Sequence, residues 1–241
     1  MTKRARRAAL PLLVALAAMA AEAVAQAQLG LVSQSQELKA GREADAQIRQ
    51  TYRISHDPAL NARVRTIGRK LARASDRPDI PWTFRVIESD DINAFSVPGY
   101  VYVNTGLIQA VDGHTDELAG VIAHEVGHTA GRHAAKQMEK SFIGGLIGEM
   151  IGGNRFTTQL VNVAENLILL GYSRDDENDA DRRAVKYLLR AGYDPNGLVR
   201  FFKLLQKKES KAPGLLTYFR THPPTGDRIE RVREQIRKQR D

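Results

Sequence analysis

The chain has 241 residues, of which 42% are hydrophobic and 27% are charged. This is enough apolar material for one sizeable core, and the composition excludes collagen-like, low-complexity and wholly disordered chains. The formal net charge is +8 at pH 7, which would suit an anionic partner such as nucleic acid or a membrane surface, so the position of the excess matters.

The N-terminus has the pattern of a secretory signal. Four basic residues precede an apolar run over 8–21, which is shorter than the roughly 20 residues of a membrane-spanning helix. Small residues follow at 23–25, with 25–27 as a second candidate cleavage site. We therefore expect residues 1–25 to be a cleaved signal peptide and 33–241 to form a single domain. An uncleaved N-terminal anchor or a buried helix is the alternative.

Removal of residues 1–25 would take away four basic residues and one acidic residue, so much of the basicity belongs to targeting. The remainder gathers over 228–240, where the pattern predicts an amphipathic helix with a solvated basic face. No base-stacking aromatic residues accompany it, so we expect no nucleic-acid binding.

The chain has no cysteine, hence no disulfide and no lipid-bearing N-terminal cysteine. We expect a soluble periplasmic or secreted protein, with peripheral membrane contact left open. The sequence specifies no oligomeric state.

The N-terminal half shows two helical patterns and two strand patterns. Residues 33–53 are polar and favour a helix, and apolar residues at spacings of three and four predict a second helix over 58–74. Runs of aromatic and β-branched residues predict strands over 82–87 and 100–103. A loop is expected over 93–99, and Pro98 and Gly99 favour an edge position for the strand that follows.

The C-terminal half is mainly helical. A helix is expected from Thr115, a candidate N-cap, toward Lys140. The apolar, glycine-rich segment 142–153 that follows is either a packed helix, a mobile lid or a patch that touches lipid. Further helices are expected from near Glu177 to Gly192, and from Asp194-Pro195 onward. Together the patterns predict an α+β fold, mostly helical, with a small β-sheet beside the helix over 115–140.

The sequence His124-Glu125-Val126-Gly127-His128 is an H-E-x-x-H motif within a predicted helix. At about 100° per residue, the two histidines lie about 40° apart and one turn apart, so both can bind one ion. Glu125 can then act as the general base toward a water activated by the metal. An accidental pattern is the alternative, but unpaired polar groups on so apolar a helix would cost several kcal/mol.

Catalytic zinc takes three protein ligands, and two schemes offer the third. The metzincin pattern needs a histidine ten residues after the first. That position is Ala134, and His133 lies one residue short and about 180° around the helix from His124, so we interpret His133 as structural. The gluzincin scheme takes a carboxylate from a second helix. Glu177 can bind the metal, and Asp181, one turn later, can accept a hydrogen bond from a ligating histidine.

These residues resemble a zinc metallopeptidase family that includes the type 1 CAAX prenyl protease, heat-shock membrane proteases and periplasmic proteases of outer-membrane quality control. The matching motifs extend over roughly 33–228 and are the following: Asn93-Ala94-Phe95 with Pro98-Gly99, Glu117 to Val121 leading into the His124 motif, Arg132-His133, Ser173-Arg174 with Glu177 and Ala180-Asp181, and Thr221-His222-Pro223. Tyr100 departs from the pattern, because a second glycine is expected there. The helical-repeat domain of some periplasmic relatives is also not expected here.

The resemblance implies a zincin-like fold, one Zn²⁺ per chain and endopeptidase activity on unfolded polypeptides of the cell envelope. It implies Glu177 as the third ligand and places His222 and Arg228 near the catalytic centre, where His222 would contact the substrate or stabilise the oxyanion. We also expect substrate contacts along the edge of the strand over 100–103 and just before it. The candidates are Asn93, Ala94, Tyr100, Val101 and Tyr102. A zinc-binding periplasmic chaperone or scaffold, with latent or no proteolysis, is the rival function.

Overall fold

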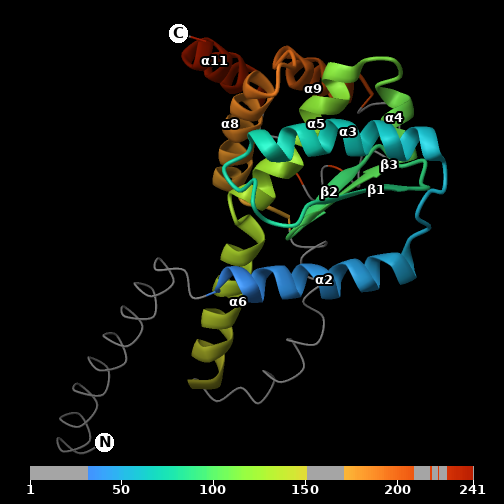
Figure 1. Cartoon of the computed structure of the whole chain (residues 1–241). Coiled ribbons are helices and arrows are strands. Elements are labelled where there is room, and N and C mark those ends of the chain that lie inside the picture. The colour runs from blue at the N-terminus through green and yellow to red at the C-terminus, as the bar shows by residue number, and fades with distance from the viewer. Residues whose placement is uncertain (1–31, 151–170, 209–217, 219–221, 223–226, 241) are drawn as a thin grey trace, which may run out of the picture.

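The computed structural model describes residues 32–150, 171–208, 218, 222 and 227–240. Its elements, in chain order, are α2 (Gln34–Thr51), α3 (Pro58–Ala74), β1 (Thr83–Ile87), β2 (Ala94–Val97), β3 (Tyr100–Asn104), α4 (Thr105–Ala110), α5 (Thr115–Ala130), α6 (His133–Met150), α8 (Arg174–Arg190), α9 (Asn196–Lys208) and α11 (Arg228–Arg240). Helices surround one small sheet (Figure 1), which confirms the predicted α+β class.

The predicted signal segment, residues 1–25, lies outside the described residues. Within the described ranges, no helix combines the length and apolar character that crossing a membrane requires.

The two N-terminal helices begin at strong local caps. Ser33 forms a capping box with Gln36 at the start of α2, and the Asp57 side chain accepts hydrogen bonds from the Ala59 and Leu60 amides of α3 at 2.8 and 3.0 Å. Such caps satisfy amides that have no partner within the helix. Both helices match their predicted ranges to within two residues.

The sheet corrects two expectations. Its strand order is β1-β3-β2, with β1 parallel and β2 antiparallel to β3. The predicted loop over 93–99 contains the strand β2, because Val97 pairs with Tyr100 and Pro98-Gly99 closes a two-residue hairpin between them. The edge position predicted for 100–103 is wrong, since β3 is the central strand and is paired on both sides. The hairpin strand that lies at the edge of the sheet is β2.

Helix α5 forms the centre of the core. Its apolar residues pack between the sheet, α3, α8 and α9, and Leu118, Val121 and Ile122 are fully buried. Helix α8 passes close to it because Gly127 has no side chain, as a Cβ atom there would lie 2.8 Å from the carbonyl oxygen of Ala180. The two helices therefore approach each other at the H-E-x-x-H motif.

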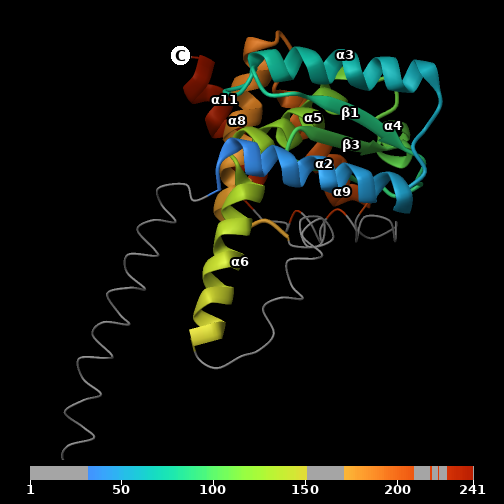
Figure 2. The same ribbon diagram turned by 60° about the horizontal axis from the view of Figure 1, so that its bottom comes forward.

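The helix predicted from Thr115 toward Lys140 is interrupted. Helix α5 ends at Ala130, Arg132 adopts a left-handed conformation with φ of 57°, and α6 begins at His133. Residues 142–150 of the glycine-rich segment continue α6, and 151–153 lie outside the described residues. In both views the distal part of α6 extends beyond the other labelled elements (Figures 1 and 2).

The remaining helices begin close to their predicted positions. Helix α8 was expected to begin near Glu177. It begins about one turn earlier, at Arg174, because Ser173 forms a capping box with Asp176. Before α9, the Asp194 carboxylate accepts from the Asn196 amide at 3.1 Å. Helix α11 packs on α8 and α9 through buried Val232 and Ile236. Most of its basic residues lie toward solvent, which confirms its amphipathic pattern, but Arg228 at its start is buried. Figure 2 shows α8 and α11 together at one end of the molecule.

Candidate metal centre

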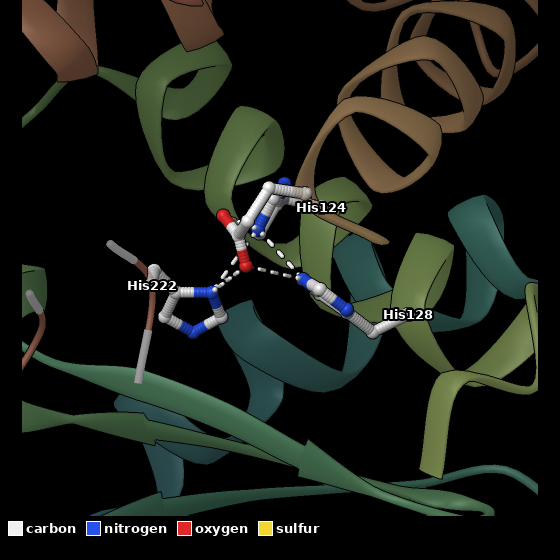
Figure 3. Close-up of side chains that lie close together, drawn as sticks. His124, His128 and His222 are labelled. Atoms are coloured by element: carbon white, nitrogen blue, oxygen red, sulfur yellow. Dashed lines mark hydrogen bonds and ion pairs between the residues drawn. The ribbon is translucent and has the colours of Figure 1, made fainter. Parts of the chain in front are cut away.

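The predicted site residues come from distant parts of the chain and meet in the core. His124, Glu125 and His128 lie on α5, Glu177 lies on α8, and His222 approaches from the C-terminal region. All five are at most 1% exposed. Figure 3 shows the three imidazoles turned toward one another around a common point.

The donor atoms of this cluster are spaced like the ligands of one ion. His124 Nε2 lies 3.0 Å from His128 Nε2, and the Glu177 oxygens lie 3.5 Å and 3.3 Å from these two nitrogens. Tetrahedral zinc with bonds of about 2.0–2.1 Å separates neighbouring ligand atoms by roughly 3.3 Å. The donor set therefore fits such an ion.

His222 offers a fourth donor atom to the same point. Its Nδ1 lies 3.0 Å from Glu177 Oε1 and 3.3 Å from His124 Nε2, and the donor atoms of His124, His128, Glu177 and His222 all lie within 4.8 Å of one another. The sequence indicated the first three as ligands and gave His222 only a catalytic role.

Burial and neighbouring charges shape the titration of these groups. Burial lowers the pKa of His124, but Asp181 and Glu177 outweigh it and raise that pKa to about 9. Burial also dominates at His128 and holds its pKa well below the ordinary value. Burial raises the pKa of Glu177, but the facing imidazoles, led by His222, lower it well below its usual range. Glu177 is thus an anion, as a metal-binding carboxylate must be.

Glu125 lies beside the donor cluster and has separate partners. Its Oε2 accepts a hydrogen bond from Ser96 Oγ on β2 at 2.9 Å, and its Oε1 lies 3.3 Å from His222 Nε2. The carboxylate is therefore held between the sheet and the donor cluster.

Asp181 and Arg228 surround the cluster on the α8 side. Asp181 Oδ1 lies 2.8 Å from His124 Nδ1, the nitrogen that faces away from the donor atoms. Arg228 on α11 donates to both oxygens of Asp181 at 2.8 Å, and its Nη1 lies 2.8 Å from Glu177 Oε2. The structure thus places Arg228 against the carboxylates, where it orients them.

The structure separates the five substrate-binding candidates. Ala94 lies on the edge strand β2, and Asn93 immediately precedes it. Tyr100, Val101 and Tyr102 lie on β3, between β1 and β2, and the Tyr102 hydroxyl donates to Asp45 at 2.7 Å. The main chain of β3 is therefore already paired, and a substrate strand cannot add to it.

Sequence reasoning missed two aromatic contacts of the cluster. The Tyr172 ring stacks on His128 with centroids 3.8 Å apart, and the Tyr218 ring stacks on His222 at 4.7 Å. Neither tyrosine stands at a motif spacing, so no local signal indicated them. His133, interpreted as structural, lies against His128.

Comparison with known proteins identifies the family that this geometry represents. Residues 58–236 match peptidase family M48. The chain belongs to this family. The resemblance to zinc metallopeptidases drawn from the sequence is confirmed, and M48 membership supports the expected metalloendopeptidase class.

Individual M48 relatives are moderately similar. The chain is 28% identical over 227 residues to the beta-barrel assembly-enhancing protease of Escherichia coli, covering 87% of this chain and 45% of the relative. It is 30% identical over 163 residues to Metalloprotease YcaL of Escherichia coli (65% and 63%). It is 27% identical over 171 residues to the mitochondrial metalloendopeptidase OMA1 of Schizosaccharomyces pombe (70% and 50%). The chain thus spans less than half the length of the beta-barrel assembly-enhancing relatives.

Proposed function

We propose that this M48 chain is a zinc-dependent endopeptidase in which His124, His128 and Glu177 bind the metal and Glu125 is the general base. The observation that carries the proposal is the convergence of two imidazoles and one carboxylate at ligand spacing, directly beside a second carboxylate that is free of the ligand role. Two nitrogens and one oxygen in a tetrahedral arrangement suit zinc, and metal analysis of the purified protein tests this identity.

Zinc bound here would act as a Lewis acid that acidifies a coordinated water and polarises the scissile carbonyl. Glu125 accepts the proton of the attacking water and passes it to the leaving amine. The His222 ring can donate to the developing oxyanion. In the structure, His222 Nδ1 lies 3.0 Å from Glu177 and its Nε2 lies 3.3 Å from Glu125. Arg228 and Asp181 hold Glu177 and His124 in position.

The strand β2 is the proposed guide for the substrate. It is one of the two edge strands of the described sheet. Unlike β1, it contacts the candidate site, because Ser96 in its middle donates to Glu125. An extended polypeptide that pairs with β2 would pass the general base through main-chain hydrogen bonds, which tolerate many sequences. Asn93 and Ala94 would contact it. Tyr100, Val101 and Tyr102 would act only indirectly, through β3.

We further propose that the chain is exported after cleavage near residue 25 and acts in the periplasm on unfolded or unassembled envelope proteins. The N-terminal pattern and the similarity to beta-barrel assembly-enhancing proteases support this. Peripheral membrane contact is compatible with it. The rival is a zinc-binding chaperone with latent or no proteolysis, which the full burial of the cluster favours, since substrate must displace covering residues.

A casein assay separates the two functions. We expect slow cleavage by the wild type, loss of cleavage in Glu125→Gln with zinc retained, and loss of cleavage on chelation that zinc restores. Removing a general base typically lowers the rate by about 10²–10⁴-fold. Protection of unfolded casein from aggregation by both proteins, with cleavage by neither, would instead establish the chaperone.

A further inference from the structure

The two motif histidines are supported from behind in different ways. His124 Nδ1 faces a carboxylate directly, because Asp181 Oδ1 lies 2.8 Å away. His128 Nδ1 instead lies 2.9 Å from the Nδ1 atom of another histidine, His133. His133 is fully buried, and its Nε2 lies 3.1 Å from Asp179 Oδ2. The His133 imidazole thus lies between His128 Nδ1 and the Asp179 carboxylate.

Metal binding determines which ring nitrogens of His128 and His133 carry the protons. His128 Nε2 faces His124 and Glu177, so it must carry a lone pair when it binds a metal. Its proton then resides on Nδ1 and is donated to His133 Nδ1. Because His133 Nδ1 then accepts, the ring carries its proton on Nε2 and donates it to Asp179. With a metal on His128 Nε2, this is the only set of tautomers that gives one donor and one acceptor to both contacts, His128–His133 and His133–Asp179.

Asp179 can serve as the terminal acceptor because two arginines pair with its carboxylate. Arg183 Nε donates to its Oδ2 at 2.7 Å, and Arg182 pairs with its Oδ1. The same Oδ2 lies 3.1 Å from His133 Nε2.

The break between α5 and α6 brings His133 into this position. On a continuous helix, residues five apart point about 140° away from each other, so His128 and His133 could not meet. The left-handed residue Arg132 redirects the chain, and its Nε donates to buried Glu37 at 3.0 Å. Gly131 is also required, because a Cβ atom there would lie 2.5 Å from His133 Nε2.

We propose that His133 is a positioning residue that, supported by Asp179, fixes the tautomer and orientation of His128 for metal binding. The inference rests on the proposed function, since it assumes that His128 binds the metal. The competing interpretation is a histidine that only fills the core. That role needs the volume of the ring and does not depend on an acceptor at the Nδ1 position.

Zinc affinity of the purified protein, measured by competition with a chromophoric chelator, distinguishes the two roles without using activity. Loss of such an outer partner typically weakens metal binding by about 10–100-fold. We expect this loss in His133→Phe, which keeps a ring of similar size. His133→Asn, whose Oδ1 can accept from His128 Nδ1–H, should recover most of it. His56→Phe, at an exposed histidine outside the site, is the control and should match the wild type.

Equal affinities in the wild type and in a folded His133→Phe variant would overturn the inference, as would equal losses in the phenylalanine and asparagine variants. Nitrogen-15 NMR of the zinc-loaded, histidine-labelled wild type gives a test free of folding artefacts. We expect a neutral His133 with its proton on Nε2, and a proton on Nδ1 or on both nitrogens would contradict the proposal. A wild type that binds no zinc would instead refute the proposed function itself.

Discussion

Arg228 is the cation that faces the two buried carboxylates Asp181 and Glu177. Its guanidinium contacts Asp181 through two nitrogens and Glu177 through the third. Burial lowers the pKa of Arg228, but these two carboxylates raise it further above its ordinary value, so the side chain stays charged. A buried charge left without its partner is expensive, whereas the intact pair adds little net stability.

Replacing Arg228 with alanine is therefore expected to lower the free energy of unfolding of the zinc-free protein by about 3–5 kcal/mol. Urea denaturation measures the loss. Arg228→Lys keeps the charge without the planar pair of donors and should lose less. Unchanged stability in Arg228→Ala would show that the carboxylates do not depend on this cation.

At the scale of elements, α2 is attached to the sheet by an apolar cluster that includes Ala44 and Ile48 and by one carboxylate. Asp45 on α2 accepts hydrogen bonds from Tyr102 of β3 at 2.7 Å and from Arg85 of β1 at 2.8 Å. Burial raises the pKa of Asp45, but these two partners outweigh it and lower that pKa below its ordinary value. The link therefore depends on the ionised form.

This link predicts a pH-dependent stability. A carboxyl group with a lowered pKa in the folded state contributes stability above its unfolded pKa of about 3.9, and the contribution is lost as the pH falls through the folded value. We expect Asp45→Asn to be less stable than the wild type by about 2 kcal/mol at pH 7, with the difference shrinking below about pH 4. Urea denaturation at pH 7 and below about pH 4 measures this difference in the free energy of unfolding. Asp79→Asn, at an exposed carboxylate, is the control. A pH-independent difference would contradict the ionic link.

Local signals predicted those elements whose boundaries are set locally. The apolar spacing over 58–74 predicted α3, whose start the structure shows capped by Asp57, and the apolar spacing of Val232 and Ile236 indicated the buried face of α11. The strand β2 was missed because its four residues gain their pairing from β3 across the hairpin. The end of α5 was missed because Arg132 is held in its left-handed conformation by Glu37, 95 residues earlier.

The same distinction applies to the site. The motif spacing placed His124 and His128 on one helix face, and the run of carboxylates on a second helix supplied Glu177 and Asp181. The structure brings these groups together, and ligation itself stays a prediction. The contact between His133 and His128 could not be predicted, because it depends on the interruption after Ala130.

At the scale of the whole molecule, a bound metal would connect α5 and α8, whose donor residues lie about 50 positions apart in the sequence. An ion that binds only the folded chain stabilises it in proportion to the logarithm of its free concentration.

We therefore expect chelation to lower the melting temperature by about 5–10 °C relative to protein with zinc at 100 times its dissociation constant, which corresponds to about 2.7 kcal/mol. Calorimetry measures the shift. Glu125→Gln should show the same shift because Glu125 is not a ligand, whereas Glu177→Ala should lose most of it. A melting temperature indifferent to zinc would refute the metal centre.

The position of Arg228 in the sequence has a consequence for folding. His124, His128 and Glu177 all precede α11, which carries the guanidinium that contacts Glu177 and Asp181. Before α11 docks, the two carboxylates lack this cation, and burying them without it is costly. The donor cluster can therefore close fully only after α11 has been made and has packed onto α8.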